Sequence, residues 1–206
     1  MDAIILKPVV EIAKSGAKSI DPARDLCGFV ARVLGTVPED VVGIVAGDPM
    51  RQVRTRNCIR LAHRTGEILA GRGVKETVAL SATIALPLLA AAQDEGREEM
   101  QEMWARMLAN AMSPAKAETM RLEFVDALRR LHPRDTQILQ KMSESTAQLG
   151  PSSRDHFAGR LKISVHAADV ALHNLERVRC IKPGGPGSLS YYMTAFGHEL
   201  IGACTV

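Results

Sequence analysis

A chain of 206 residues with 46% apolar residues is long enough for one large domain or two small ones, and it is too apolar for intrinsic disorder. The formal net charge of +3 requires no polyanionic partner, and one Trp, two Tyr and four Phe are too few rings for a platform that stacks single-stranded nucleic acid. The four cysteines form no CxxC pair, and the N-terminus has no signal-peptide pattern, so we expect free thiols in a cytoplasmic protein without a metal or cofactor.

The first 48 residues carry only weak helical signals. The clearest lies in the segment ARDLCGFVARVLG, residues 23–35, where apolar side chains recur at helical spacing. These apolar residues are Leu26, Phe29, Val30, Val33 and Leu34. Pro38 and Gly47 interrupt the chain that follows, and the role of residues 1–40 stays open.

Residues 50–71 form a clearer predicted helix that is rich in arginine and ends at Gly71 and Gly73. Its arginines are Arg51, Arg54, Arg56, Arg60 and Arg64, and they outnumber the single acid Glu67. The last three stand at i, i+4 and i+8 and share a face. They either bind phosphate groups of nucleic acid or anionic lipid, or pair within the protein with acids on a neighbouring helix. We favour either pairing with Asp94, Glu95, Glu98, Glu99 and Glu102 or a solvated face over phosphate binding.

The segment TVALSATIALPLLAAAQ, residues 77–93, contains no charged residue. A membrane-spanning helix needs about 20 apolar residues, so this segment is at the short limit for a span. Pro87 interrupts it, and Ser81 and Thr83 make it less apolar. We therefore expect a buried central helix, or two short ones, with a membrane role as the alternative.

Residues 94–113 have the most regular helical pattern in the chain. An apolar stripe at helical spacing consists of Met100, Met103, Trp104, Met107, Leu108 and Ala111. The first turns carry the acidic residues Glu98, Glu99 and Glu102, which interact favourably with the positive N-terminal end of the helix dipole. Methionine-rich stripes can form adaptable binding grooves, but core packing is the commoner role, and we predict that this stripe is core.

From residue 117 onward four shorter helices are predicted. They are the segments AETMRLEFVDALRRL, HPRDTQILQKMSES, RDHFAGRLKI and SVHAADVALHNLERV. Pro133 suits the first turn of the second, and Ser164 is the expected N-cap of the fourth.

The segment CIKPGGPGSLSYYMTAFGHEL, residues 180–200, breaks the helical pattern. The β-compatible pieces RCIK and LSYYM flank the turn residues PGGPGS, which predicts a hairpin followed by a final helix. Three helices and then a hairpin is the order of a winged helix. The expected fold is therefore all-α: a helical bundle over residues 1–115, followed by a winged-helix-like module with a small β-hairpin over residues 117–206.

The fourth helix would be the recognition helix of such a module. Its candidate contact residues are Ser164, His166, Asn174 and Arg177. Asn and Arg are residue types that read bases, whereas Asp169 and Glu176 oppose DNA binding. Many winged helices bind proteins instead, and both alternatives stay open. His166 and His173 alone do not make a zinc site, and Cys180 is expected to be a packed thiol.

The chain also resembles two kinds of known protein. The segment HNLERVRCIKPGGPGSLSYYMTAFGHEL resembles the closing part of many winged helices, with MTAFG at the position of their Leu-Thr-x-x-Gly ending. Residues 43–206 resemble the bacterial Abi-alpha family through the LPLL run, the acidic patch that follows it and the block WARMLANA. That family is associated with abortive infection, in which a phage-infected bacterium stops growing or dies. The resemblance implies a role in antiphage defence and supplies no catalytic residues.

We therefore expect a defence protein that acts by binding and not by catalysis, since no hydrolase or protease motif is present. A protein partner or a second copy of the chain is the expected ligand. The alternatives are a DNA-binding transcriptional regulator and an effector that perturbs membranes.

Overall fold

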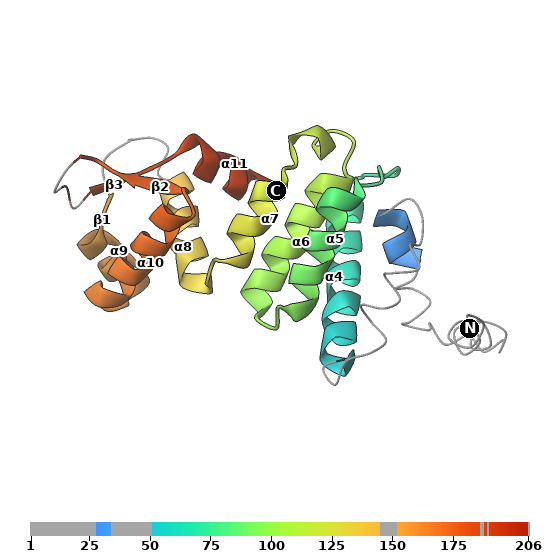
Figure 1. Cartoon of the computed structure of the whole chain (residues 1–206), viewed down its shortest axis with the longest axis horizontal. Helices are drawn as coiled ribbons and strands as arrows, with labels where there is room; N and C mark the ends of the chain where they lie inside the picture. Colours follow the sequence, from blue (N-terminus) through green and yellow to red (C-terminus); the bar gives the residue numbers. More distant parts are fainter. Residues whose placement is uncertain (1–27, 34–50, 145–151, 186–187, 189, 206) are drawn as a thin grey trace.

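Helices dominate the chain, and the expected β-hairpin lies near its C-terminus. The computed structural model describes residues 28–33, 51–144, 152–185, 188 and 190–205. Figure 1 shows helices α4, α5 and α6 at one end of the molecule, the small sheet at the other, and α7 and α8 between them. The predicted all-α class with a C-terminal hairpin is confirmed.

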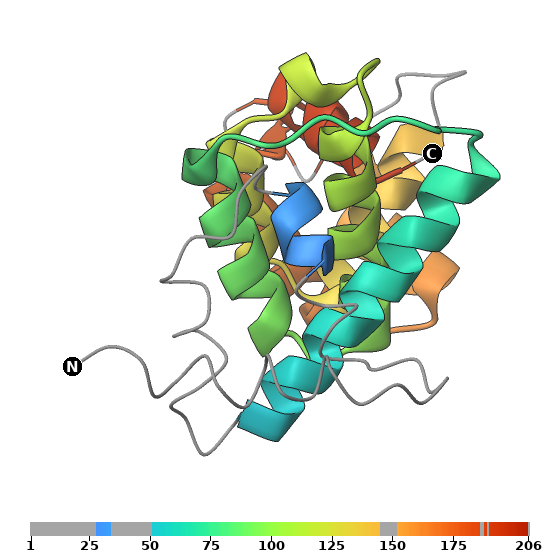
Figure 2. The same ribbon diagram turned by 90° about the vertical axis from the view of Figure 1, so that its right-hand side faces the viewer.

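Three long helices form the first end of the molecule. They are α4 (Arg51–Gly71), α5 (Ala82–Asp94) and α6 (Glu98–Met112). Helix α4 packs against both of the others. Residues 28–33 are helical as expected and bury Phe29 and Val33 in the same core, and Figure 2 shows this segment between α4 and α5. Leu26 and Leu34 lie outside the described residues.

Helix α5 begins later than the uncharged segment suggested. Residues 74–81 are not helical, and the Val78 and Leu80 amides donate instead to the carbonyls of Met112 (3.0 Å) and Val33 (2.8 Å). These bonds to other segments satisfy the backbone without a helical turn. Pro87 lies inside α5 without ending it. Across the described part of the chain, no helix has the length and apolarity needed to cross a membrane.

Helix α6 confirms the core prediction for the apolar stripe. All six stripe residues are at most 3% exposed, and Trp104 is 1% exposed. The helix starts at Glu98 and not at Asp94, which ends α5. Glu98 and Glu99 occupy its first turn, where carboxylates favour the helix dipole.

The segment after residue 115 differs from the expected continuous helix. A short 3-10 turn, Ala117–Thr119, is followed by α7 (Leu122–Arg129). The Thr119 hydroxyl donates to the Lys116 carbonyl at 2.8 Å, and Met120 and Arg121 are extended. Such a local side-chain bond competes with helix continuation. Helix α8 (Pro133–Glu144) begins at the expected proline.

The C-terminal end combines three helices with a three-stranded antiparallel sheet. Its elements are β1 (Ser152–Ser153), α9 (Arg154–Leu161), α10 (Val165–Arg177), β2 (Ile181–Pro183), β3 (Ser190–Met193) and α11 (Ala195–Ala203). The predicted hairpin is the pair β2–β3, and β1 adds an unexpected third strand in the order β1-β3-β2. The hydroxyls of Ser153, Ser164 and Thr194 cap the three helices.

The two ends share one continuous core. A single cluster of buried apolar side chains includes Trp104 of α6, Leu172 of α10 and Leu200 of α11. Helix α11 packs on both α8 and α6. The division into domains at residues 115–117 therefore stays a prediction.

Candidate functional site

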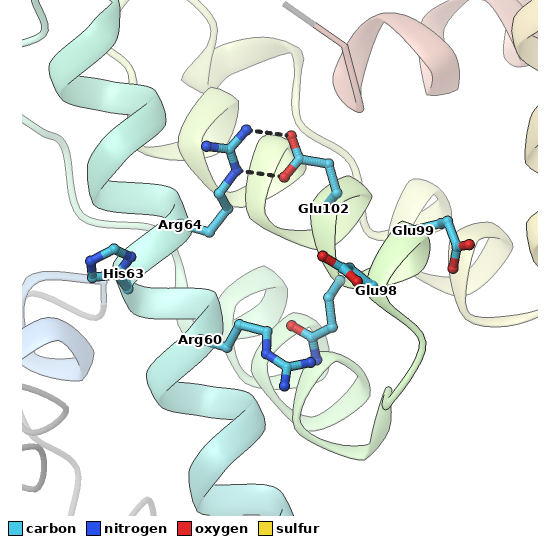
Figure 3. A pocket seen from close by; sticks show the side chains of 7 residues that line it. Arg60, His63, Arg64, Glu98, Glu99 and Glu102 are labelled. Carbon is cyan, nitrogen blue, oxygen red and sulfur yellow. Dashed lines mark hydrogen bonds and ion pairs between the residues drawn. The ribbon is translucent and has the colours of Figure 1, made fainter.

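The arginine-rich face of α4 meets acidic side chains of α6. Arg64 donates from Nε and Nη2 to the two carboxylate oxygens of Glu102, at 2.5 and 2.9 Å (Figure 3). Its Nη1 also donates to Glu67 at 2.9 Å. Arg106 adds a further bond to Glu102 at 2.6 Å. The hydrogen bonds from Arg64, followed by those from Arg106, lower the pKa of Glu102 to about 2. The charges of Arg64 and Glu102 are therefore compensated within the protein.

The other predicted arginines divide into two groups. Arg54 pairs with Asp94 at 2.6 Å, so Arg54 and Arg64 both follow the pairing interpretation. Arg56 and Arg60 are exposed, and neither forms an ion pair with any residue that the structure describes. Arg51 opens α4, and its side chain lies outside what the structure describes.

An open cavity of about 470 Å³ lies between α4 and α6. Its lining residues are Arg60, His63, Arg64, Glu98, Glu99, Gln101 and Glu102. Figure 3 shows Arg60 and Arg64 projecting from α4 towards α6, where Arg64 is bonded to Glu102 and Arg60 has no bond to Glu98. Arg64 and Glu102 thus form an ion pair in this cavity, whereas the oppositely charged Arg60 and Glu98 beside them do not.

Gln101 lines the same cavity and is 3% exposed. Its Nε2 donates to the carbonyls of Ala92 (2.7 Å) and Glu95 (2.5 Å). A flipped amide would set Oε1 against these two carbonyl oxygens, so the orientation of the side chain is fixed. Its Oε1 is a buried acceptor without a hydrogen-bond partner in the described part of the molecule. Sequence patterns contain no signal for such an unpaired atom.

Helix α10 presents a second candidate surface. His166, Val170, His173 and Arg177 stand at i, i+4, i+7 and i+11 and are all exposed. Val170 is 71% exposed, and no other large apolar side chain among the described residues is classed as exposed. Val170 was not among the predicted contact residues, although its place between two histidines on a polar face was a usable signal.

Three of the four predicted contact residues of α10 have partners within the protein, and one of them is Arg177, whose Nη2 donates to the Asn174 Oδ1 at 3.0 Å. The Ser164 hydroxyl accepts from the Ala167 amide and caps the helix, as expected. Asn174 donates from Nδ2 to the Arg130 carbonyl at 3.0 Å and to Asp135 at 2.6 Å. The Asn174 amide group therefore fastens α10 to the α7–α8 turn and is not displayed for base reading.

The described cysteines have the character of packed thiols. Burial raises the pKa of Cys58 to about 11 and that of Cys180 to about 12, and the pKa of the fully buried Cys204 is raised further. Thiols with raised pKa values are poor nucleophiles at neutral pH. Cys27 lies outside the described residues.

Comparison with known proteins adds one finding. No curated protein and no solved structure matches the chain. The model of the family described as Abortive infection alpha matches residues 56–204, which include α5 to α11 and most of α4. The matched region contains both the α4–α6 cavity and the exposed face of α10, and the chain belongs to the abortive infection alpha family.

Proposed function

We propose that this protein acts in antiphage defence of the abortive-infection type, in the cytoplasm, by binding a protein partner through the exposed face of α10. Membership of the abortive infection alpha family supports the defence role. The observation that carries the binding mode is Val170, a large apolar side chain that is 71% exposed on an otherwise polar helix face. Protein interfaces combine an apolar centre with a polar rim, and this face has that pattern.

The order of the C-terminal elements supports a winged-helix-like interpretation. Helix α8, strand β1, helices α9 and α10 and the hairpin β2–β3 follow one another, and the sheet order is β1-β3-β2. Helix α10 then takes the place of the recognition helix. Such a module presents one helix face to a macromolecule, which agrees with the exposed face of α10 that carries His166, Val170, His173 and Arg177.

The partner that fits this face best is a protein with an apolar spot and acidic neighbours. His166, His173 and Arg177 surround Val170, and Lys162 and the hairpin residue Lys182 are also exposed nearby in the chain. A DNA reader needs free Asn, Gln, Arg or Lys side chains on this face. Asn174 is engaged with Asp135, which favours a protein over a DNA site.

A phage-plating assay with matched variants tests the proposal. Val170→Asp places a charge at the centre of the face, and we expect it to abolish protection and the growth arrest of infected cells. Ala70→Asp, at an exposed position of α4, is the control and should protect as the wild type does. Full protection by Val170→Asp, at equal protein level, would contradict the proposal.

A second assay separates the protein partner from DNA. Duplex fragments of the host and phage genomes are incubated with the purified chain at physiological salt. We expect no enriched site, because phosphate contacts alone give weak binding that falls steeply with salt. Enrichment of one site that is lost in Arg177→Ala would assign the module to transcriptional regulation instead. Recovery of the protein only in a carbonate-resistant membrane fraction would favour the effector alternative.

A further inference from the structure

The α4–α6 cavity combines three groups that nothing else in the described structure uses. Arg60 supplies a guanidinium without a carboxylate partner, and Glu98 supplies a carboxylate without a cationic partner. Gln101 supplies a buried acceptor without a donor. Buried polar groups are nearly always hydrogen-bonded, so the unpaired Gln101 Oε1 requires an explanation.

In the structure, the neighbouring groups of the cavity form no hydrogen bond or ion pair with these three. Glu102 already accepts from both Arg64 and Arg106. Arg64 in turn donates to Glu102 and Glu67. In Figure 3, Arg64 and Glu102 face each other, whereas Glu99 points away from Arg60 along the far side of α6. The cavity groups that have no bonding partner among the described residues are thus Arg60, Glu98 and the Gln101 Oε1.

Their chemistry specifies the charges of a ligand. A guanidinium with free N–H groups binds a carboxylate, often through two parallel bonds. A free carboxylate together with an amide oxygen is the usual setting for an ammonium group, which has three N–H donors and no acceptor. A ligand that satisfies all three groups therefore carries a carboxylate and a protonated amine side by side.

We propose that the cavity between α4 and α6 binds a free α-amino acid. Arg60 holds its carboxylate, and Glu98 and the Gln101 Oε1 accept hydrogen bonds from its ammonium group. The volume of about 470 Å³ lies in the range of small-molecule sites, and the open side leaves room for a side chain. The site lies on α4 and α6, apart from the α10 face, and it adds a small-molecule ligand to the proposed defence function.

Titration of the isotope-labelled full-length chain tests this site. Each standard L-amino acid is added at millimolar concentration while the side-chain amide signal of Gln101 is followed by NMR. At least one amino acid is expected to shift this signal. Two derivatives of that amino acid serve as matched probes: the amide lacks the carboxylate, and the N-acetyl form lacks the ammonium. Each derivative should bind at least about tenfold more weakly, because each loses a charge-assisted hydrogen bond.

Two variants connect each charge to its residue. Arg60→Gln should weaken binding of the amino acid about tenfold and remove the preference for it over its amide. Glu98→Gln should remove the preference for it over its N-acetyl form. Arg60 is exposed and forms no described ion pair, so the thermal midpoint of unliganded Arg60→Gln should equal that of the wild type. Glu98→Gln removes a charge from the first turn of α6, so its midpoint should fall by at most about 4 °C. Gln101 itself is not substituted, because its Nε2 also holds Ala92 and Glu95.

Several results would overturn the proposal. The absence of any shift across all amino acids is one. Equal binding of an amino acid and either derivative is another, because one of the two charges would then be unused. Unchanged binding in both variants would place the ligand elsewhere. Glu123→Gln, an exposed substitution on α7, is the control and should leave binding unaltered. Loss of phage protection has no bearing on these outcomes, so this test and that of the proposed function fail independently.

Discussion

The two ends of the molecule are stabilised in different ways. Helices α4, α5 and α6 pack through large side chains such as Trp104 and Leu88, which are at most 1% exposed. The sheet end depends on close backbone contacts, because a Cβ at Gly197 of α11 would lie 2.1 Å from the Cys180 carbonyl oxygen. The sheet end also buries large side chains such as Phe157 and Leu172, so it differs from the helical end in having a position, Gly197, that excludes any side chain.

The first prediction tests the helical end and carries the largest effect. Trp104→Ala should lower the free energy of unfolding by about 3–5 kcal/mol, because it removes the largest buried side chain and leaves a cavity. Urea unfolding followed by circular dichroism measures this change. Gln137→Ala, at an exposed position of α8, is the control. The tryptophan emission of the folded wild type should be blue-shifted, and a solvent-like maximum would contradict a buried Trp104.

The second prediction tests the sheet end with two glycines of one helix. Gly197→Ala should destabilise the fold by about 1–3 kcal/mol or more, because the new methyl group collides with the Cys180 backbone. Gly202→Ala, also in α11, meets nothing within 4 Å and should stabilise the fold by about 0.5–1 kcal/mol, since alanine restricts the unfolded chain. Thermal unfolding of the two variants and the wild type measures both changes in stability. Equal effects of the two substitutions would show that the Gly197 contact is not tight.

The third prediction concerns the contact that joins the two ends. Asn110 of α6 is 1% exposed and donates to the carbonyls of Ala203 (2.8 Å) and Thr205 (3.1 Å), while its Oδ1 accepts from Arg72 at 2.6 Å. Asn110→Ala should cost about 1–3 kcal/mol, because buried carbonyls and a guanidinium lose their partner. Hydrogen exchange should locate the loss of protection in α11. Protection lost only within α6 would mean that Asn110 does not couple the ends.

Local patterns predicted much of this fold. The stripe of α6 and the cap at Ser164 depend on residues a few positions apart, and both are confirmed. Strand β1 was missed because Ser152 and Ser153 have no strand propensity of their own and pair with residues of β3 far along the chain. The end of α10 was predicted to within one residue, although Arg179 just beyond it adopts φ 64° where glycine is usual.

The candidate sites were only partly predictable. Opposite charges on two predicted helices indicated that arginines would find acidic partners, and Arg64 with Glu102 bears this out. Arg60 and Arg64 are one turn apart on the same face of α4, so the sequence pattern does not distinguish them. Which of the two meets an acidic partner depends on how α4 and α6 are positioned relative to each other. The unpaired Oε1 of Gln101 arises from the bonds of its Nε2 to the α5–α6 turn, which only the folded chain reveals.

The last prediction concerns the ion pairs on the surface of the helical end, where the expected effect is smallest. The pKa of Glu102 is lowered from 4.5 to about 2, so its pairing stabilises the folded state fully above pH 4.5 and is lost as the pH falls through about 2. Glu102→Gln should therefore lower stability at pH 7 by at most about 1 kcal/mol, because solvent screens a pair in which the Arg64 side chain is 43% exposed. Urea unfolding of both proteins across this pH range should show the difference shrinking towards pH 2. A difference that stays constant with pH would mean that the carboxylate charge does not contribute, and that the helical end is held by its apolar side chains alone.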